Sequence, residues 1–325
     1  MTSSEHKKSL TGLDFQLVKQ YSAVKYWPTW VGLALLRLLS FVPLPLLAMA
    51  GYILGTPFYL LHFSRRRIAH KNISLCFPEL SSRQQHWINY QHFCYLGQSI
   101  MSACMNWWIS PARFDRLVTI KNREHYDQAL SNKQNIILLC PHFIAIEVSG
   151  LALQRERPMV GMYQYMKNEL LNTVALRGRQ RFCPEGIMFE RKEPLRTLLR
   201  ILYKGYPLSY SPDQDAMRKG VFVPFFNTLA STTPALSKFV QTTNAVVIPC
   251  RNRMLPWGQG YEVVLGEALE GLNTGDEKTD AAAMNSAIEA MVRACPEQYL
   301  WVHKRFKSRP KEEWVDGKQP NFYKS

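Results

Sequence analysis

A long apolar stretch near the N-terminus limits what this chain can fold into. In residues 27–63, Arg37 is the only Asp, Glu, Lys or Arg. A helix that crosses a bilayer needs about 20 predominantly apolar residues. Pro57 and two prolines close to residue 44 disfavour one straight helix over the whole stretch, although proline fits a first helical turn. The sequence therefore predicts a membrane-anchoring segment at 27–63, with a helix over about 44–61.

The flanks of this stretch bear on its orientation. Residues 1–26 are polar and mixed in charge, and residues 64–71, "SRRRIAHK", contain three arginines. Arginines beside the end of an apolar helix favour the cytoplasmic side and anionic lipid. The stretch is not a secretory signal peptide, because it is too long, starts late and has no small-residue cleavage site. Spanning, interfacial and re-entrant placements stay open, as does a helical hairpin packed on the following domain.

After a long predicted helix at 83–108, short apolar runs alternate with helical patterns. The runs are apolar on consecutive positions, as in strands covered on both faces. Strands are predicted at 135–140, 158–163, 206–211, 221–226, 245–250 and 261–266, and helices at 193–204, 234–243 and 279–294. Alternating strands and helices predict an α/β domain over 64–325, with a mainly parallel central sheet flanked by helices.

Charge and cysteine content exclude several function classes. The chain carries 40 Lys and Arg against 25 Asp and Glu, a net charge of +15. Such a surface attracts nucleic acid, anionic lipid headgroups or an acidic protein, and charge alone does not choose between them. Seven cysteines without a C-x-x-C pair indicate reduced thiols rather than a redox or zinc site. The P-loop, G-x-G-x-x-G and H-E-x-x-H motifs are also missing from the sequence.

The strongest candidate for chemistry follows the first apolar strand. Pro141 ends the strand at 135–140, and a helix is predicted from about Phe143, so His142 lies in the turn between them. Glu147, in the second turn of that helix, could accept a hydrogen bond from Nδ1 and raise the basicity of Nε2. Such a dyad can deprotonate an alcohol that attacks an acyl carbon. The alternative is a capping histidine with an unrelated surface glutamate.

Three further residues are candidates for substrate binding. Asp213 and Asp215 follow the strand at 206–211, so they belong to the carboxyl edge where open α/β sheets bind ligands. They would orient an arginine or a substrate headgroup, and the alternative is an Asx turn. Lys219 is a lesser candidate for a phosphate contact. A Cys140 acyl-enzyme relay with His142 is a rival mechanism, disfavoured because Pro141 separates the two residues.

Several of these segments resemble one known family in order and spacing. The chain resembles the late acyltransferases of lipid A biosynthesis, the lauroyl/myristoyl family within the glycerolipid acyltransferase superfamily. The matching segments are "KYWPTWVGLALLRLLS" (25–40), "RRRIAHKNISLCFPELS" (65–81), "PHFIAIE" (141–147), "GRQRF" (178–182), "SPDQD" (211–215), "VFVPFFN" (221–227) and "PEQYLWVHKRFKSRP" (296–310).

The resemblance implies a membrane-anchored enzyme on the cytoplasmic face of a bacterial inner membrane. It would transfer a fatty acyl chain from acyl carrier protein to a hydroxyl of a Kdo-bearing lipid A precursor. The family's H-x-x-x-x-[DE] motif falls on His142 and Glu147, which would be general base and orienting carboxylate. The resemblance also implies that Arg179 and Arg181 bind lipid phosphates or the thioester oxygen.

We expect no cofactor, no metal and no nucleic-acid partner, because a thioester donor requires no nucleotide and two carboxylates beside a dyad are a weak metal signal. Acyl carrier protein is acidic, so a net charge of +15 suits their encounter. Two other functions remain compatible with the sequence. One is an acyltransferase that acts on a phospholipid or lyso-lipid. The other is a non-catalytic binder of lipid or acyl carrier protein.

Overall fold

The structure, a computed structural model, describes residues 15–324, so most of the predicted polar segment at 1–26 lies outside the described residues. Its helices are α2 (Phe15–Gln20), α3 (Trp27–Leu39), α4 (Leu44–Leu61), α5 (Phe63–Cys76), α6 (Ser82–Trp108), α7 (Pro111–Leu117), α8 (Glu124–Ser131), α9 (Glu147–Leu153), α10 (Glu169–Gln180), α11 (Leu195–Tyr203), α12 (Ala235–Thr243) and α13 (Glu277–Arg293). Short 3₁₀ turns are η1 (Val24–Tyr26), η2 (Met217–Lys219), η3 (Pro256–Gly258), η4 (Pro296–Gln298) and η5 (Lys311–Glu313).

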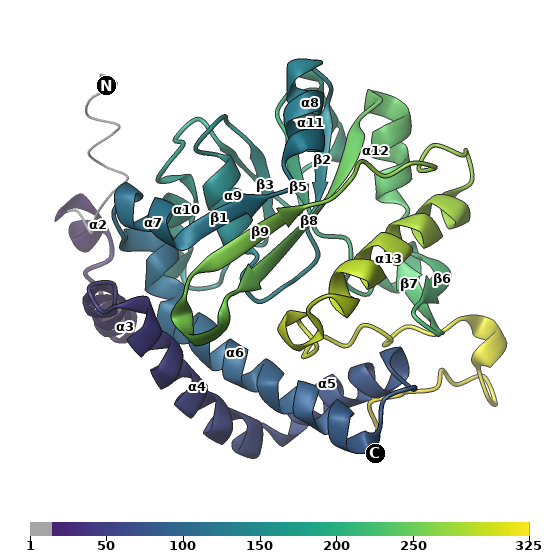
Figure 1. Cartoon of the computed structure of the whole chain (residues 1–325), viewed down its shortest axis with the longest axis horizontal. Coiled ribbons are helices and arrows are strands. Elements are labelled where there is room, and N and C mark those ends of the chain that lie inside the picture. The colour runs from purple at the N-terminus through teal and green to yellow at the C-terminus, as the bar shows by residue number, and fades with distance from the viewer. Residues whose placement is uncertain (1–14, 325) are drawn as a thin grey trace.

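A seven-stranded sheet forms the centre of the molecule, with helices around it (Figure 1). Its strand order is β1-β9-β8-β2-β5-β3-β4. Neighbouring strands are parallel except β8 and β9, which are antiparallel. The strands are β1 (Val118–Lys121), β2 (Ile136–Leu139), β3 (Val160–Tyr163), β4 (Ile187–Glu190), β5 (Leu208–Tyr210), β8 (Val246–Met254) and β9 (Tyr261–Leu265). The predicted α/β fold with a mainly parallel sheet is confirmed.

All six predicted strands form, but one belongs elsewhere. β6 (Val221–Phe225) pairs with β7 (Thr228–Thr232) in a separate antiparallel hairpin. β1, β4 and β7 were not predicted, and each of these strands is only four or five residues long. All four residues of β2 are buried, since β2 lies between β5 and β8. The strand before His142 is therefore at the middle of the sheet.

The helix after β2 begins later than the sequence predicts. It was expected from about Phe143, whereas α9 starts at Glu147. The intervening chain is held by the C-terminal segment instead. The N–H of Ile144 donates to the carbonyl of Gln298 at 2.9 Å, and the N–H of Leu300 donates to the carbonyl of His142 at 2.9 Å. These long-range bonds satisfy backbone groups that a helix would otherwise use, so the turn stays open.

The N-terminal helices line one border of the molecule (Figure 1). α4 has the predicted bounds of 44–61, and Pro43 and Pro45 lie at its start. Within the described residues, α4 is the one helix that is long and apolar enough to cross a bilayer by length and composition. It runs alongside α6, where the hydroxyls of Thr56 and Tyr90 are hydrogen-bonded at 3.0 Å.

Candidate active site

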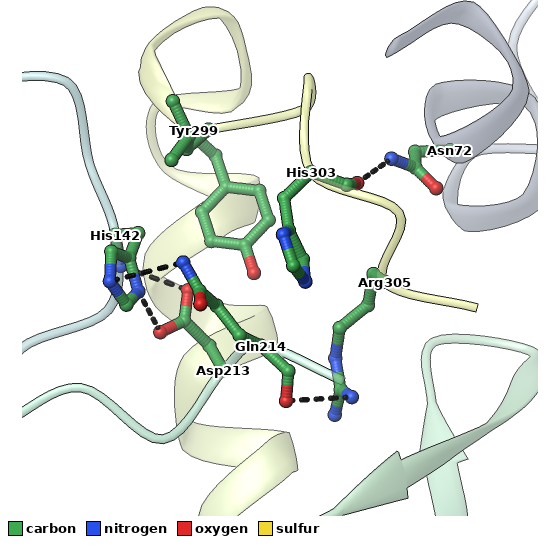
Figure 2. A pocket seen from close by; sticks show the side chains of 8 residues that line it. Asn72, His142, Asp213, Gln214, Tyr299, His303 and Arg305 are labelled. Atoms are coloured by element: carbon green, nitrogen blue, oxygen red, sulfur yellow. Dashed lines mark hydrogen bonds and ion pairs between the residues drawn. The ribbon is translucent and has the colours of Figure 1, made fainter. Parts of the chain in front are cut away.

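His142 is held at the carboxyl edge of the sheet by an aspartate from the neighbouring strand. Asp213 follows β5, which is parallel to β2, so both residues leave the sheet at the same edge. His142 Nδ1 lies 2.7 Å from Asp213 Oδ1, and the His142 backbone N–H donates to Asp213 Oδ2 at 2.9 Å. One carboxylate thus fixes both the ring and the backbone of His142 (Figure 2).

The pair has the electrostatics of a general base and its orienting carboxylate. Burial by itself lowers the pKa of His142, but the charge of Asp213 and its hydrogen bond outweigh burial and raise that pKa above 6.5. Burial raises the pKa of Asp213, but the His142 charge and hydrogen bonds more than offset this and lower it to about 2. Asp213 is therefore ionised at neutral pH, and its side chain is only 1% exposed, against 28% for His142.

A small pocket opens beside the other ring nitrogen. Its lining includes Gln214, Tyr299, His303 and Arg305 as well as the pair itself (Figure 2). Gln214 Nε2 lies 3.3 Å from His142 Nε2. An amide N–H that donates there requires a lone pair on Nε2, which matches a neutral ring with its proton on Nδ1. A substrate hydroxyl that replaced this amide could donate its proton to Nε2.

The other polar residues of the lining are themselves held by hydrogen bonds. The buried phenol of Tyr299 is hydrogen-bonded to Asp213, and burial together with this anion raises the pKa of Tyr299 well above 10. The N–H of Asp215 donates to Nε2 of His303 at 3.3 Å, and burial lowers the pKa of His303. The buried Arg305 donates to the Ser231 carbonyl at 2.6 Å. These groups form a polar shell around the carboxylate.

The predicted pairing of His142 with Glu147 is wrong in this structure. Glu147 Oε1 accepts hydrogen bonds from Arg179, at 2.5 Å from Nη2 and 3.2 Å from Nε. Glu147 is the first residue of α9 rather than part of its second turn, because α9 starts four residues later than predicted. Both partners are partly exposed, at 28% and 26%. Asp213 holds the position that had been assigned to Glu147.

The structure separates the other predicted substrate ligands from the pocket. The Arg181 guanidinium donates to the Ile109 carbonyl at 2.6 Å, just beyond α6, and lies over the Phe182 ring. Burial lowers the pKa of Arg181 to about 10. Asp215 is buried and accepts a hydrogen bond from Ser308 at 3.0 Å. Lys219 is exposed at the end of η2. None of these three lines the described pocket.

Sequence reasoning missed Tyr299, Arg305 and Gln214 as parts of the site. Within the matching segment at 296–310, His303 is interpreted as a packed histidine rather than a second base, and nothing in the spacing shows that this segment crosses back to the turn after β2. The signal for Asp213 was available, however. Two strands that both end in polar residues can be neighbours in a parallel sheet, and then those residues meet at one edge.

This arrangement is suited to proton transfer. Among residues 15–324, no group of three or more His, Cys, Asp or Glu side chains is placed to hold a metal ion. An imidazole that is oriented by a buried carboxylate and faces a pocket can accept a proton from a hydroxyl in that pocket. Cys140, the rival nucleophile, directly follows β2 and is fully buried.

Comparison with known proteins identifies the family to which the sequence is similar. Residues 16–308 match the family described as bacterial lipid A biosynthesis acyltransferase. Three similar relatives come from Escherichia coli. A lipid A biosynthesis lauroyltransferase is 32% identical, with 88% of this chain and 93% of the relative aligned. A palmitoleoyltransferase is 32% identical, with 90% and 95% aligned, and a myristoyltransferase is 27% identical, with 98% and 99% aligned. The chain therefore belongs to the bacterial lipid A biosynthesis acyltransferase family.

Proposed function

We propose that this acyltransferase transfers a fatty acyl chain from acyl carrier protein to a hydroxyl of a Kdo-bearing lipid A precursor. The reaction takes place at the cytoplasmic face of the inner membrane. The observation that carries the proposal is the contact between His142 Nδ1 and Asp213 Oδ1, because it leaves Nε2 facing the pocket as a base. Membership of the family supports the lipid A acceptor.

The proposed reaction proceeds by direct attack. His142 Nε2 takes the proton of the acceptor hydroxyl while its oxygen attacks the thioester carbonyl carbon. The C–S bond then breaks, and the leaving thiolate receives the proton from His142. Asp213 remains ionised and stabilises the imidazolium that forms between these two steps. Attack by the hydroxyl itself requires no covalent acyl-enzyme, so Cys140 has no part in this route.

Charge supports the choice of donor and acceptor. The precursor is a phosphorylated lipid, and acyl carrier protein is acidic, so both approach a chain of net charge +15 favourably. Arg179 is held by Glu147 near the sheet edge and keeps part of its guanidinium exposed. We propose that this arginine contacts an anionic group of the substrate, since a guanidinium offers paired donors to phosphate. Glu147 then acts as the residue that positions Arg179.

The test is acyl transfer by purified protein, with acyl carrier protein thioester as donor. His142→Ala should abolish transfer while the variant folds and stays with the membrane. His125→Ala is the matched control, since His125 is exposed on α8. Near-normal transfer by His142→Ala would reject the proposed base. Offering a lyso-phospholipid alongside the lipid A precursor tests the acceptor, and equal use of both would reject the assigned substrate class.

Lipid A from cells provides a second readout. Mass spectrometry of lipid A from cells with the active protein and with His142→Ala should differ by one or more acyl chains. An identical profile would support a binding protein without catalysis.

A further inference from the structure

A face of exposed apolar side chains follows α3 and α4. Its members include Leu35, Leu38, Phe41, Met49, Ile53 and Leu61, each more than half exposed. We call this set the N-terminal apolar face. Soluble monomers rarely expose a contiguous apolar surface that follows two helices, so such a face indicates a binding surface. The question is whether lipid surrounds these helices or covers them from one side only.

The opposite side of α4 is fixed to α6 at backbone contact distance. A Cβ on Gly51 would lie 2.3 Å from Cα of Gln98, and a Cβ on Gly55 would lie 2.4 Å from Cα of Cys94. On the partner helix, a Cβ on Gly97 would lie 2.1 Å from the carbonyl oxygen of Gly51. Only glycine permits so close an approach. The two helices therefore form one rigid unit along most of α4.

α6 is in turn part of the catalytic domain. The buried His92 on α6 lies with Nδ1 3.3 Å from the carbonyl oxygen of Glu297, and burial lowers the pKa of His92 to about 3. The connection between α3 and α4 is also anchored, because Arg113 donates at 2.5 Å to the carbonyls of both Ser40 and Val42. A bilayer crossing by α4 would draw α6 and these polar contacts into hydrocarbon, where buried polar groups are costly.

The length of α3 points the same way. α3 has 13 residues, which at 1.5 Å per residue is about 20 Å, well short of a hydrocarbon core of about 30 Å. We infer that α3 and α4 lie in the plane of the membrane surface, with the N-terminal apolar face immersed and neither helix crossing. This inference does not depend on the proposed acyl transfer.

A tryptophan from the sheet extends this face. Trp257 lies in η3, in the hairpin between β8 and β9, with 78% of the residue exposed and a left-handed φ of 56°. A bulky residue in that conformation is uncommon and strained. The hairpin rests on the start of α4, since a Cβ on Gly258 would lie 2.6 Å from Cα of Pro45. Trp257 is thus a second membrane contact, in the interfacial position that tryptophan favours.

Charge identifies the occupant as an anionic lipid surface. From Phe15 to Phe77 the sequence contains seven Lys and Arg and no Asp or Glu. Arg65 and Arg67 are exposed directly after α4. Basic residues that flank an apolar face are typical of helices that lie on anionic membranes. α5 then leads from this face to the pocket, where Asn72 donates to the carbonyls of Trp301 and His303 at 2.7 Å.

Sidedness of single cysteines tests the in-plane placement. The seven native cysteines are buried, so introduced thiols can be labelled selectively. Ser22→Cys lies before α3, Phe41→Cys between α3 and α4, and Ser64→Cys after α4, while Glu124→Cys marks the catalytic domain. The full chain is placed in sealed vesicles with the domain outside, and a membrane-impermeant maleimide is added before or after pore-forming permeabilisation that leaves the bilayer intact.

For an in-plane anchor, permeabilisation should raise labelling at none of these positions. If α3 and α4 both crossed as a hairpin, Phe41→Cys alone would label only after permeabilisation. A single crossing would place Ser22→Cys or Ser64→Cys on the side opposite Glu124→Cys. Any permeabilisation-dependent label therefore overturns the inference.

Quenching of tryptophan fluorescence by brominated lipids tests Trp257. In vesicles that contain phosphatidylglycerol and brominated phosphatidylcholine, Trp257→Phe should remove part of the bromine-quenched emission. Trp314→Phe is the control, because Trp314 is exposed outside the N-terminal apolar face. An unchanged quenched fraction in Trp257→Phe would show that this hairpin stays out of the membrane.

Discussion

Asp213→Asn is the most informative single change at the site. It keeps the shape of the side chain but removes the negative charge that lies 2.7 Å from His142 Nδ1. In the wild type this charge and the hydrogen bond to Asp213 together outweigh burial and raise the pKa of His142. Without it, burial remains as the dominant effect, so the pKa of His142 falls. The amide can also donate toward Nδ1, which favours the wrong tautomer of the ring.

The size of the effect follows from two contributions. A general base is active when neutral, so kcat/KM rises with pH through the His142 pKa, which lies above 6.5 in the wild type. We call this rising part of the pH profile the pH limb. Loss of an adjacent opposite charge should move the pH limb to a pH that is about 1–3 units lower. Loss of general-base catalysis should lower the plateau by about 10²–10⁴-fold, or about 3–5 kcal/mol in activation free energy.

The assay is the pH profile of acyl transfer by purified protein, with Asp215→Asn as the matched control. Asp215 is also buried, but its carboxylate bonds Ser308 rather than His142. Asp215→Asn should therefore leave the pH limb in place. If Asp213→Asn lowered the plateau without moving the limb, Asp213 would have only a structural role. A wild-type profile in Asp213→Asn would refute the reasoning altogether.

Three other outcomes follow from the contacts. Glu147→Gln should lower acyl transfer without moving the pH limb, since Glu147 contacts Arg179 rather than His142. It should change the free energy of unfolding by no more than about 1 kcal/mol, because the ion pair is partly exposed. A shifted pH limb in this variant would support the predicted dyad of His142 and Glu147. Gly97→Ala should destabilise the folded protein by about 1–3 kcal/mol, because it forces α4 and α6 apart. Gly150→Ala is the control, since Gly150 has open space around it, and thermal unfolding in detergent would show the difference. Cys140→Ser should retain transfer in the same assay, and a loss of several orders of magnitude would revive the acyl-enzyme route.

Local sequence patterns predicted the elements whose bounds depend on residues close together in the sequence. The bounds of α4 could be predicted because a long apolar run meets prolines that fit a first turn. The strand before His142 could be predicted because β2 is apolar at every position and Pro141 ends it. β1 and β4 were missed. Both are edge strands of the sheet, and β1 alternates partly buried with exposed residues, so it lacks the consecutive apolar positions on which the other strands were predicted.

The partner of His142 could not be chosen from spacing, because a contact distant in the sequence decides it. The bonds from Ile144 to Gln298 and from Leu300 to His142 keep the chain after β2 out of helix, so Glu147 starts α9. About 155 residues separate the partners in each bond, so no local pattern shows them. Asp213 was correctly placed at the same sheet edge, but it was assigned to substrate rather than to the base.

The double contact of Asp213 explains why fold and chemistry are hard to separate at this site. One oxygen accepts from the backbone of His142 and the other from its ring. The backbone bond fixes the turn after β2, and the ring bond then fixes where Nε2 points. The position of a carboxylate on α9 depends on the turn after β2, because α9 follows that turn in the chain. Such a carboxylate therefore could not fix the turn. A carboxylate from the neighbouring parallel strand is anchored by the sheet itself, which makes Asp213 better suited to orient a base.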